Sequence, residues 1–528
     1  MKRSLSLLFA VLTLILCGCG KETANTAAEE EAEQVSASLE TLKQSVSTLS
    51  FYKNIQSLDL TQDDITVCTV EYPTIKLSSD DAEKYPVLKR TLDNINSAFS
   101  QSGQTIFEQL SASAVDAYFF GTQEQENESV EDKEKFAAYK RSVSVYLPRS
   151  DSKAVSILCR SAMFSGGEDA DITYSSFNCD TVSGREIDIR NIVNDMGAFR
   201  DVLEACLADS YPEVDFTGLM DKLNRYMEDP TQFVWTIDYQ GITIYFNPYE
   251  LTDYDAGVLT VSLRFDNYSE LLNQSYAEIP SRYVSPLIDG KCYNYDLDLN
   301  SASDEITVAD SYNEDLEYSD TLNITVNGRT VSTQTWLKAY ECYVVHAGLG
   351  RDYLFINGEN LNEYGYISVF SLGKTGASFV GGLYKTSLHA AAYSGFCEGR
   401  AVLTNPDSFV MGSLCELLYP QVGIKTYYIG NDGMPASNDS FYLLSSSQIL
   451  TSKNELSTVS INPDTGSGNQ SAIKIPAKTQ FYFWRTDGES YIDMKTSVGT
   501  ACRLFITVKN KTEYVNGINA EDLFDGIN

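Results

Sequence analysis

The sequence predicts an α+β protein in which two antiparallel sheet-plus-helix domains are followed by a β-rich C-terminal region. Two observations lead to this prediction. In the first half, a stretch opening at Pro86 places apolar residues mostly three or four positions apart, which is the spacing of one helix face. Beyond position 290 this spacing gives way to short alternating runs beside turn pairs such as Asn357-Gly358. Hydrophobic residues make up 43% of the 528, so the chain can bury several cores.

The first half alternates between strand and helix patterns. A strand is predicted at 65–72, and the long helix that begins at Pro86 contains Gly103 as a point of interruption. Further strands are predicted at 141–149, 154–164, 232–238, 242–247 and 257–265, and further helices from about 192, with Asp195 as N-cap, and at 216–227. Ile242, Ile244 and Phe246 alternate, so we expect them to share one buried face.

The C-terminal region is predicted to be almost entirely strands. The alternating runs lie at 321–326, 342–346, 352–357, 365–371, 379–384, 424–429, 478–484, 489–494 and 502–508. One helix is predicted near 408–419. The region is therefore expected to contain sheets with little helical cover.

The first residues have the form of a secretory leader. Lys2 and Arg3 precede a nearly unbroken apolar run, which ends in Leu16-Cys17-Gly18-Cys19. A cysteine after Leu-x-Gly resembles a bacterial lipobox, which implies that Cys19 receives a diacylglyceryl group and becomes the N-terminus. The run is shorter than the ~20 residues of a spanning helix. The alternative is a plain secreted protein with a chance cysteine.

These patterns divide the chain into five parts. They are a signal peptide at 1–18, an acidic tether at 19–50, an α+β domain at 51–150, a second α+β domain at 151–288 and the β-rich region at 289–528, which is long enough for two subdomains. A two-chain lipid on Cys19 is sufficient for stable attachment, so we expect the mature protein on the outer face of the cytoplasmic membrane.

The net charge indicates which partners the protein could bind, and the cysteine content indicates whether disulfides are expected. The formal net charge is −34, which argues against nucleic acid and favours cationic partners or simple solubility. Apart from Cys17 and Cys19, the cysteines are odd in number, and none forms a Cys-x-x-Cys pair: Cys68, Cys159, Cys179, Cys206, Cys292, Cys342, Cys397, Cys415 and Cys502. We therefore expect small buried hydrophobic side chains rather than a disulfide framework.

Three stretches between 65 and 273 carry a family resemblance. They are Tyr72-Pro-Thr-Ile75 leading to Pro86, the Gly166-Gly167 pair followed by 174–186, and 241–257. Together they resemble the paired extracytoplasmic domains shared by RsiV, a lysozyme-sensing anti-sigma factor, and by the non-catalytic part of the peptidoglycan deacetylase PdaC. The resemblance implies a binding module. The family commonly has Ala-His after the Gly-Gly pair, whereas this chain has Glu168-Asp169.

Candidate ligand-binding residues lie in two loops of this segment. Glu168 and Asp169 follow the Gly-Gly turn, and a second group lies in the loop that follows the strand at 242–247. That group consists of Tyr249, Asp253, Tyr254 and Asp255. Exposed tyrosines among acids suit a cationic protein partner. The alternative is that the acids are solvated surface residues and the tyrosines pack into the core.

The sequence shows no complete catalytic or metal motif. Its histidines are His346 and His389, each in an apolar context without zinc-ligand spacing, and we expect them to be ordinary packed residues. Gly412-Ser413 lacks the closing glycine of a nucleophile elbow. Partial calcium-like runs at 296–300 and 462–466 do not complete a binding loop. We therefore predict no catalytic residue, no metal and no cofactor.

The sequence thus predicts a non-catalytic surface protein anchored to the membrane through Cys19. The expected partner is a cationic muramidase of the lysozyme type or peptidoglycan, and the acidic charge suits the former better. The alternatives are an enzyme or enzyme accessory acting on cell-wall glycans, or a purely structural surface protein.

Overall fold

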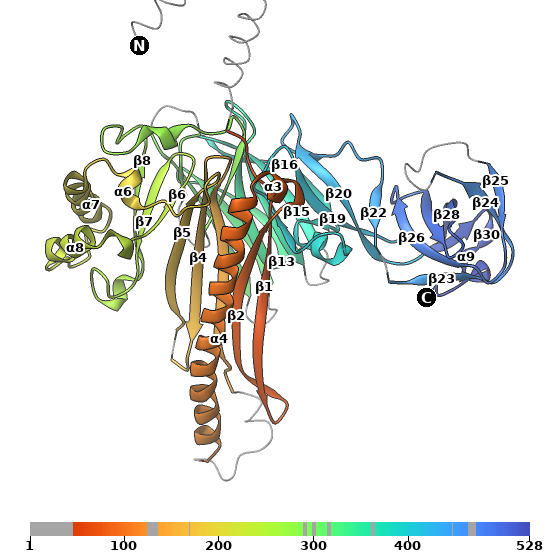
Figure 1. Cartoon of the computed structure of the whole chain (residues 1–528), viewed down its shortest axis with the longest axis horizontal. Helices are drawn as coiled ribbons and strands as arrows, with labels where there is room; N and C mark the ends of the chain where they lie inside the picture. The colour runs from red at the N-terminus through yellow and green to blue at the C-terminus, as the bar shows by residue number, and fades with distance from the viewer. Residues whose placement is uncertain are drawn as a thin grey trace, which may run out of the picture. The chain divides into compact units, whose positions relative to one another are not determined.

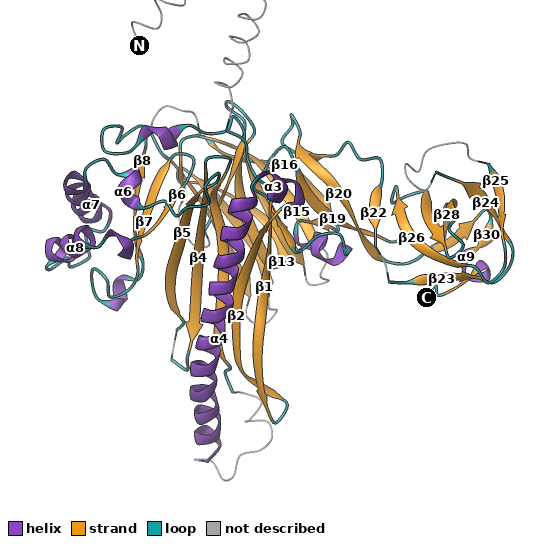
Figure 2. Ribbon diagram, viewed as in Figure 1, coloured by secondary structure: helices purple, strands orange, loops and turns teal. Residues whose placement is uncertain are grey.

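The computed structural model confirms the α+β class, with several antiparallel sheets, a few helices and a β-rich C-terminal region (Figures 1 and 2). It describes residues 46–123, 136–167, 169–288, 293–297, 302–313, 318–360, 365–445, 447–462 and 471–527. The predicted leader, the predicted lipidation residue Cys19 and the candidate residue Glu168 lie outside these ranges. No helix among the described residues is both long enough and apolar enough to cross a membrane.

The N-terminal sheet has the strand order β18-β1-β2-β3-β4-β5. Its strands are β1 (Phe51–Gln62), β2 (Ile65–Leu77), β3 (Tyr139–Ser150), β4 (Ala154–Phe164), β5 (Asp171–Asp180) and β18 (Arg400–Val402). Neighbours pair antiparallel except β2 and β3, which are parallel. The sheet continues across position 150, where the sequence suggested a domain limit, because β3 and β4 form a hairpin.

Two helices connect β2 to β3. The short α3 (Ser79–Lys84) precedes the long α4 (Pro86–Gln123), which begins at Pro86 as predicted and lies against β2 (Figure 2). Gly103 does not interrupt α4. A Cβ atom at Gly103 would lie 2.7 Å from Cδ1 of Tyr72, so this glycine allows the helix to approach β2 closely.

A small helix-capped sheet follows in the chain. It consists of β6 (Val234–Ile237), β7 (Gly241–Phe246) and β8 (Leu259–Arg264), and it packs with α6 (Ile189–Ile192), α7 (Met196–Ser210) and α8 (Leu219–Glu228). The predicted N-cap is confirmed, since Asp195 accepts hydrogen bonds from the amides of Gly197 and Ala198. Ile242, Ile244 and Phe246 are buried in one core with the helices, as their alternation predicted. Short 3₁₀ turns are η1 (Pro230–Gln232), η2 (Tyr254–Ala256) and η3 (Gln274–Ala277).

Two further sheets make up the β-rich region. The central sheet contains β9 (Tyr283–Pro286), β10 (Tyr293–Tyr295), β11 (Asp304–Asn313), β12 (Tyr318–Val326), β13 (Arg329–His346), β14 (Asp352–Asn360), β15 (Gly365–Gly373) and β16 (Gly376–Tyr384). The C-terminal sheet contains β17 (Thr386–Ser387), β19 (Phe409–Cys415), β20 (Gln421–Ile429), β21 (Pro435–Ala436), β22 (Tyr442–Leu444), β23 (Ile449–Ser452), β24 (Leu456–Ser460), β25 (Ala472–Ile475), β26 (Gln480–Thr486), β27 (Tyr491–Thr496), β28 (Ala501–Lys509), β29 (Thr512–Val515), β30 (Ile518–Asn519) and β31 (Phe524–Asp525). The remaining helical elements are η4 (His389–Ser394) and α9 (Ala520–Leu523).

The helix predicted near 408–419 is wrong, because this segment contains strand β19. Phe409 and Met411 are buried at alternate positions, which is the period of a strand. A Cβ atom at Gly412 would lie 2.5 Å from the carbonyl carbon of Ala390, so the strand passes close to η4. The spacing of apolar residues along the chain does not reveal this contact with a neighbouring backbone, so it could not correct the helix prediction.

A shared core joins the N-terminal sheet to the β-rich region. Val143 and Val145 of β3 belong to the same buried cluster as Tyr343 and Val345 of β13, with Met411 of β19. The two sheets therefore meet through an apolar interface, and the charged pocket described below is set into it.

The described cysteines are free thiols. Most are buried, and Cys206 and Cys397 are partly buried, as expected for small hydrophobic side chains. Burial raises the pKa of the Cys159 thiol to about 12, so this thiol is protonated at neutral pH.

Candidate functional site

The loop predicted to carry ligand-binding residues is fixed by hydrogen bonds at its start. Asn247, directly after β7, accepts from the amide of Tyr174 at 2.6 Å and donates to the Tyr174 carbonyl at 3.1 Å. Leu251 anchors the middle of the loop in the core beneath α7 and α8. The backbone of the loop is therefore fixed at Asn247, next to β5, and at Leu251.

Tyr249 is the most conspicuous side chain of this loop. It is 72% exposed, and its backbone has φ +69°, a left-handed conformation that is costly for a residue with a Cβ atom. Its ring lies 5.4 Å, centroid to centroid, from the ring of Tyr254. Tyr254 is partly buried, so the exposed ring on the strained backbone is that of Tyr249, and such a ring is typical of a binding surface rather than of packing.

Acidic side chains from two loops surround this tyrosine pair. The Tyr254 hydroxyl hydrogen-bonds Asp171, which is the main reason that the pKa of Tyr254 is raised, and Asp169 lies near enough to contribute. Asp253 and Asp255 flank Tyr254 in the chain, and all four carboxylate residues are exposed. We call the set Asp169, Asp171, Tyr249, Asp253, Tyr254 and Asp255 the acidic patch.

The structure thus brings together Asp169, Tyr249 and Tyr254, three of the residues selected from the sequence. Sequence analysis missed Asp171, which is the first residue of β5 and follows the predicted Gly-Gly turn. Gly166 needs to be glycine, because its φ is +91° and a Cβ atom would lie 2.6 Å from the Tyr139 hydroxyl.

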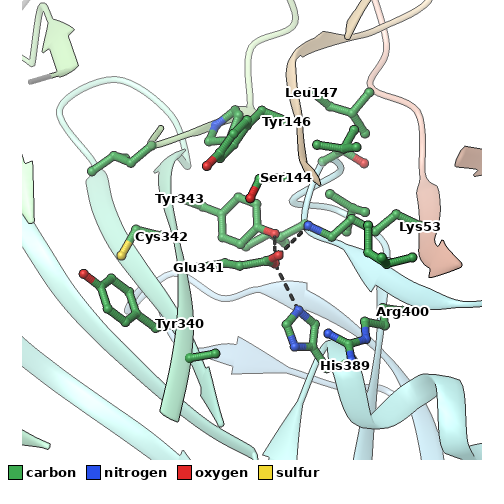
Figure 3. A pocket seen from close by; sticks show the side chains of 18 of the residues that line it. Lys53, Ser144, Tyr146, Leu147, Tyr340, Glu341, Cys342, Tyr343, His389 and Arg400 are labelled. Carbon is green, nitrogen blue, oxygen red and sulfur yellow. Dashed lines mark hydrogen bonds and ion pairs between the residues drawn. The ribbon is translucent and has the colours of Figure 1, made fainter. Parts of the chain in front are cut away.

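A second candidate site is a pocket of about 270 Å³ between the N-terminal and central sheets (Figure 3). Its apolar wall comes mainly from β3 and β18, with Val143, Val145, Leu147 and Val402. Its charged side comes from β1, β13, η4 and β18, with Lys53, Glu341, His389 and Arg400. We call it the charged pocket.

Glu341 is the centre of the polar network in the charged pocket. It forms an ion pair with Lys53 of β1, accepts a hydrogen bond from the Tyr343 hydroxyl at 2.7 Å, and lies 3.1 Å from Nε2 of His389. Nδ1 of His389 lies 2.8 Å from a carboxylate oxygen of Glu359. The imidazole is therefore placed between two carboxylates from neighbouring strands, and Figure 3 shows the Glu341 side of this arrangement.

The charges of this network shift one another's pKa values. Burial opposes ionisation of Glu341, but Lys53 and His389 outweigh it and hold its pKa well below the ordinary 4.5. The hydrogen bond with His389 also lowers the pKa of Glu359. Burial lowers the pKa of His389, but the two carboxylates reverse this and raise it above 6.5. Burial and the nearby Glu341 carboxylate raise the pKa of Tyr343, so this residue remains a donor.

The backbone explains why these distant residues meet. Lys53 pairs in register with Arg400, which brings the start of the N-terminal sheet to a strand from the C-terminal half. Glu341 and Tyr343 are two residues apart on β13 and so point to the same face. The start of η4 is held because the amide of Leu388 donates to Asn357 at 2.9 Å, which positions His389.

The two histidines have different surroundings. His346 lies 2.8 Å from Asp352 and stacks on Tyr283, which is a packed role as expected. His389 instead lines the charged pocket. In the described part of the chain, no group of three His, Cys, Asp or Glu side chains has an arrangement that could hold a metal ion. Asp298, Asn300 and Asp464 of the calcium-like runs lie outside the described residues.

Comparison with known proteins gives matches to solved structures alone. No family model and no curated protein matches the chain. A DUF3298 family member from Bacteroides fragilis matches 44% of this chain and 97% of its own, at 13% identity and a TM-score of 0.32. A DUF3298 family protein from Pseudomonas aeruginosa matches 44% of this chain and 96% of its own, at 12% identity and a TM-score of 0.26.

Proposed function

We propose that the chain is a lipid-anchored bacterial surface protein that binds a cationic protein, of the lysozyme type, through the acidic patch and has no catalytic role. The observation that carries this proposal is the exposed Tyr249 ring, which lies against the partly buried Tyr254 among carboxylates on a fixed loop. Tyrosine supplies contact area at low entropic cost, and the carboxylates steer and orient a basic partner.

The global charge supports the same class of partner. At −34, the chain attracts basic proteins over the distance of a Debye length, about 8 Å at physiological salt. The family resemblance of segment 65–273 to the RsiV and PdaC domains adds lysozyme to the candidates, with peptidoglycan as the second ligand.

The binding experiment measures the affinity of the purified mature protein for hen lysozyme at low and high salt. We expect binding at low salt, with weakening as salt rises. Tyr249→Ala and the pair Asp169→Asn with Asp171→Asn should each reduce affinity by about tenfold or more. The matched controls are Tyr393→Ala, at another exposed tyrosine, and Asp209→Asn with Glu213→Gln, which removes equal charge elsewhere. Equal losses in patch and control variants would show that only net charge matters.

Anchoring is tested by metabolic labelling with a fatty acid. We expect Cys19→Ala to abolish labelling and Cys17→Ala to leave it intact, because the cut is placed directly before Cys19. Labelling that persists in Cys19→Ala and is lost in Cys17→Ala would reject this assignment.

The second candidate function is an enzyme or enzyme accessory acting on wall glycans. The observation in its favour is that Glu341 and Glu359 both lie beside His389 at the charged pocket. Release of soluble products from wall fragments by the wild-type protein, abolished by Glu341→Gln, would support it over the binding proposal.

A further inference from the structure

The charged pocket differs from the other buried ionic cluster of the N-terminal sheet. That cluster centres on Arg149, which pairs with Asp151 at 2.8 Å and donates to the carbonyls of Tyr276 and Glu278 at 2.6 and 2.9 Å. Both members of the pair are fully buried. A buried arginine with its donors satisfied and no access to solvent has a structural role.

Arg400 in the charged pocket lacks such partners. Among the described residues its guanidinium makes no hydrogen bond or ion pair, and it interacts with Glu359 only through longer-range electrostatics. Figure 3 shows the guanidinium beside the His389 ring, on the pocket side. An arginine presents several donors in a planar fork that fits a carboxylate, so an unpartnered one in a pocket is a ready anion site.

His389 provides a second observation at the same pocket wall, because its Nε2 atom is only imperfectly paired. Its Nε2 atom is buried and, although 3.1 Å from a Glu341 oxygen, has no well-aligned hydrogen bond. Buried polar atoms are normally well hydrogen-bonded, so an imperfectly aligned N–H at a pocket wall can also donate to a ligand or water. Solvent reaches this region, since 27% of the Glu341 side chain is exposed.

The pocket also has room and an apolar wall. Its volume of about 270 Å³ is many times the ~10–15 Å³ that one water occupies by the same measure. Val143, Val145 and Leu147 alternate along β3 and form an aliphatic face opposite the charged groups. A site with one polar end and an apolar body suits a small amphiphilic molecule.

The summed charge of the side chains around the pocket indicates which charge the polar end of a ligand should carry. Lys53 on β1 and Arg400 on β18 are balanced by Glu341 on β13 and Glu359 on β14, while Tyr343 on β13 is neutral. Protonated His389 on η4 makes the sum +1. One negative charge neutralises this cluster, whereas a phosphate dianion leaves an excess.

We propose that the charged pocket binds a small aliphatic monocarboxylate, with its carboxylate on Arg400 and Nε2 of His389 and its chain against the β3 wall. This site is separate from the acidic patch. Binding stabilises the protonated imidazole, so the ligand and a proton on His389 bind together.

The test is calorimetric titration of the full mature protein with hexanoate, with 1-hexanol and acetate as probes that lack the charge or the chain. We expect millimolar or tighter binding of hexanoate, at least about tenfold weaker binding of both other probes, and weaker hexanoate binding at pH 8 than at pH 6. Arg400→Gln should weaken hexanoate binding by about tenfold or more. The matched control is Arg329→Gln, at an exposed strand end.

A second variant guards against a folding defect. Ala339→Phe fills the pocket from β13 without removing charge, and should also block hexanoate while the thermal midpoint stays near that of the wild type. Hexanoate binding that is unchanged in both Arg400→Gln and Ala339→Phe would overturn the proposal, as would no binding of hexanoate by folded wild-type protein at millimolar concentration. Neither result bears on lysozyme binding, which is measured at the acidic patch.

Discussion

The acidic patch and the charged pocket use the same residue types in opposite ways. In the patch, the carboxylates and Tyr249 are exposed and lie on two loops and at the start of β5. In the pocket, two carboxylates are compensated by Lys53 and His389 at the junction of two sheets. Surface carboxylates add little to stability, whereas removing one member of a buried pair is costly. The patch is therefore free to serve binding, while the pocket residues serve stability as well as any ligand.

The substitution Glu341→Ala gives the strongest test of whether the charged pocket contributes more to stability than the acidic patch. Removal of this carboxylate leaves Lys53 and His389 without their shared partner, and we expect a loss of about 3 kcal/mol in the free energy of unfolding. The control is Asp253→Ala in the acidic patch, which should stay within about 0.5 kcal/mol of the wild type. Urea denaturation of the three proteins measures both values. Equal effects would mean that the charged pocket is no more coupled to folding than a surface loop.

The pH dependence of stability gives a smaller effect. His389 has a raised pKa, so its contribution is complete below pH 6.5 and is lost as the pH rises through its folded pKa. Glu341 and Glu359 have lowered pKa values, so their contributions are complete above pH 4.5 and are lost as the pH falls through their folded values. The cluster should therefore stabilise most between about pH 4.5 and 6.5.

The corresponding measurement is the free energy of unfolding from pH 6 to pH 8 for the wild type and His389→Gln. We expect the difference between the two proteins to shrink as the pH rises. His346→Gln, at the packed histidine beside Asp352, is the control for loss of a histidine. A constant difference across this range would contradict the raised pKa of His389.

The smallest expected effect on stability lies in the acidic patch. Tyr249→Asn places a residue that tolerates a left-handed backbone at φ +69°, and should raise the free energy of unfolding by a few tenths of a kcal/mol, at most about 1. The same variant should weaken lysozyme binding, because the ring is lost. Tyr393→Asn, at an exposed tyrosine that is not among the left-handed residues, should give no gain. A loss of stability in Tyr249→Asn would show that the ring serves packing.

The two sites also differ in how far the sequence reveals them. Tyr249 and Tyr254 lie five residues apart in one loop, and the Gly-Gly turn before Asp169 marks the other, so local motifs locate most of the patch. The helix at Pro86, the hairpin at 232–247 and the cap at Asp195 were predictable for the same reason, since each depends on neighbouring residues.

The charged pocket depends on contacts that no local pattern contains. Lys53, Glu341, Glu359, His389 and Arg400 come from separate elements, and β18 joins β1 across almost 350 positions. The sequence does contain one feature that points to the charged pocket. In a strand, Glu341 lies on the same face as Tyr343 and Val345, which are buried. A carboxylate on a buried face needs a partner, so this pattern predicts a polar contact at Glu341. The strand β1 was also missed, because most of its residues are at least partly exposed and its apolar pattern is weak.

The most direct test of the account is hydrogen–deuterium exchange of the mature protein with and without lysozyme. The account predicts slower amide exchange at 169–173 and 247–257 in the complex, with exchange around Glu341 and His389 unchanged. Protection confined to the charged pocket or to the C-terminal sheet, or no protection in a solution where lysozyme is bound, would contradict the assignment of the acidic patch as the protein-binding surface.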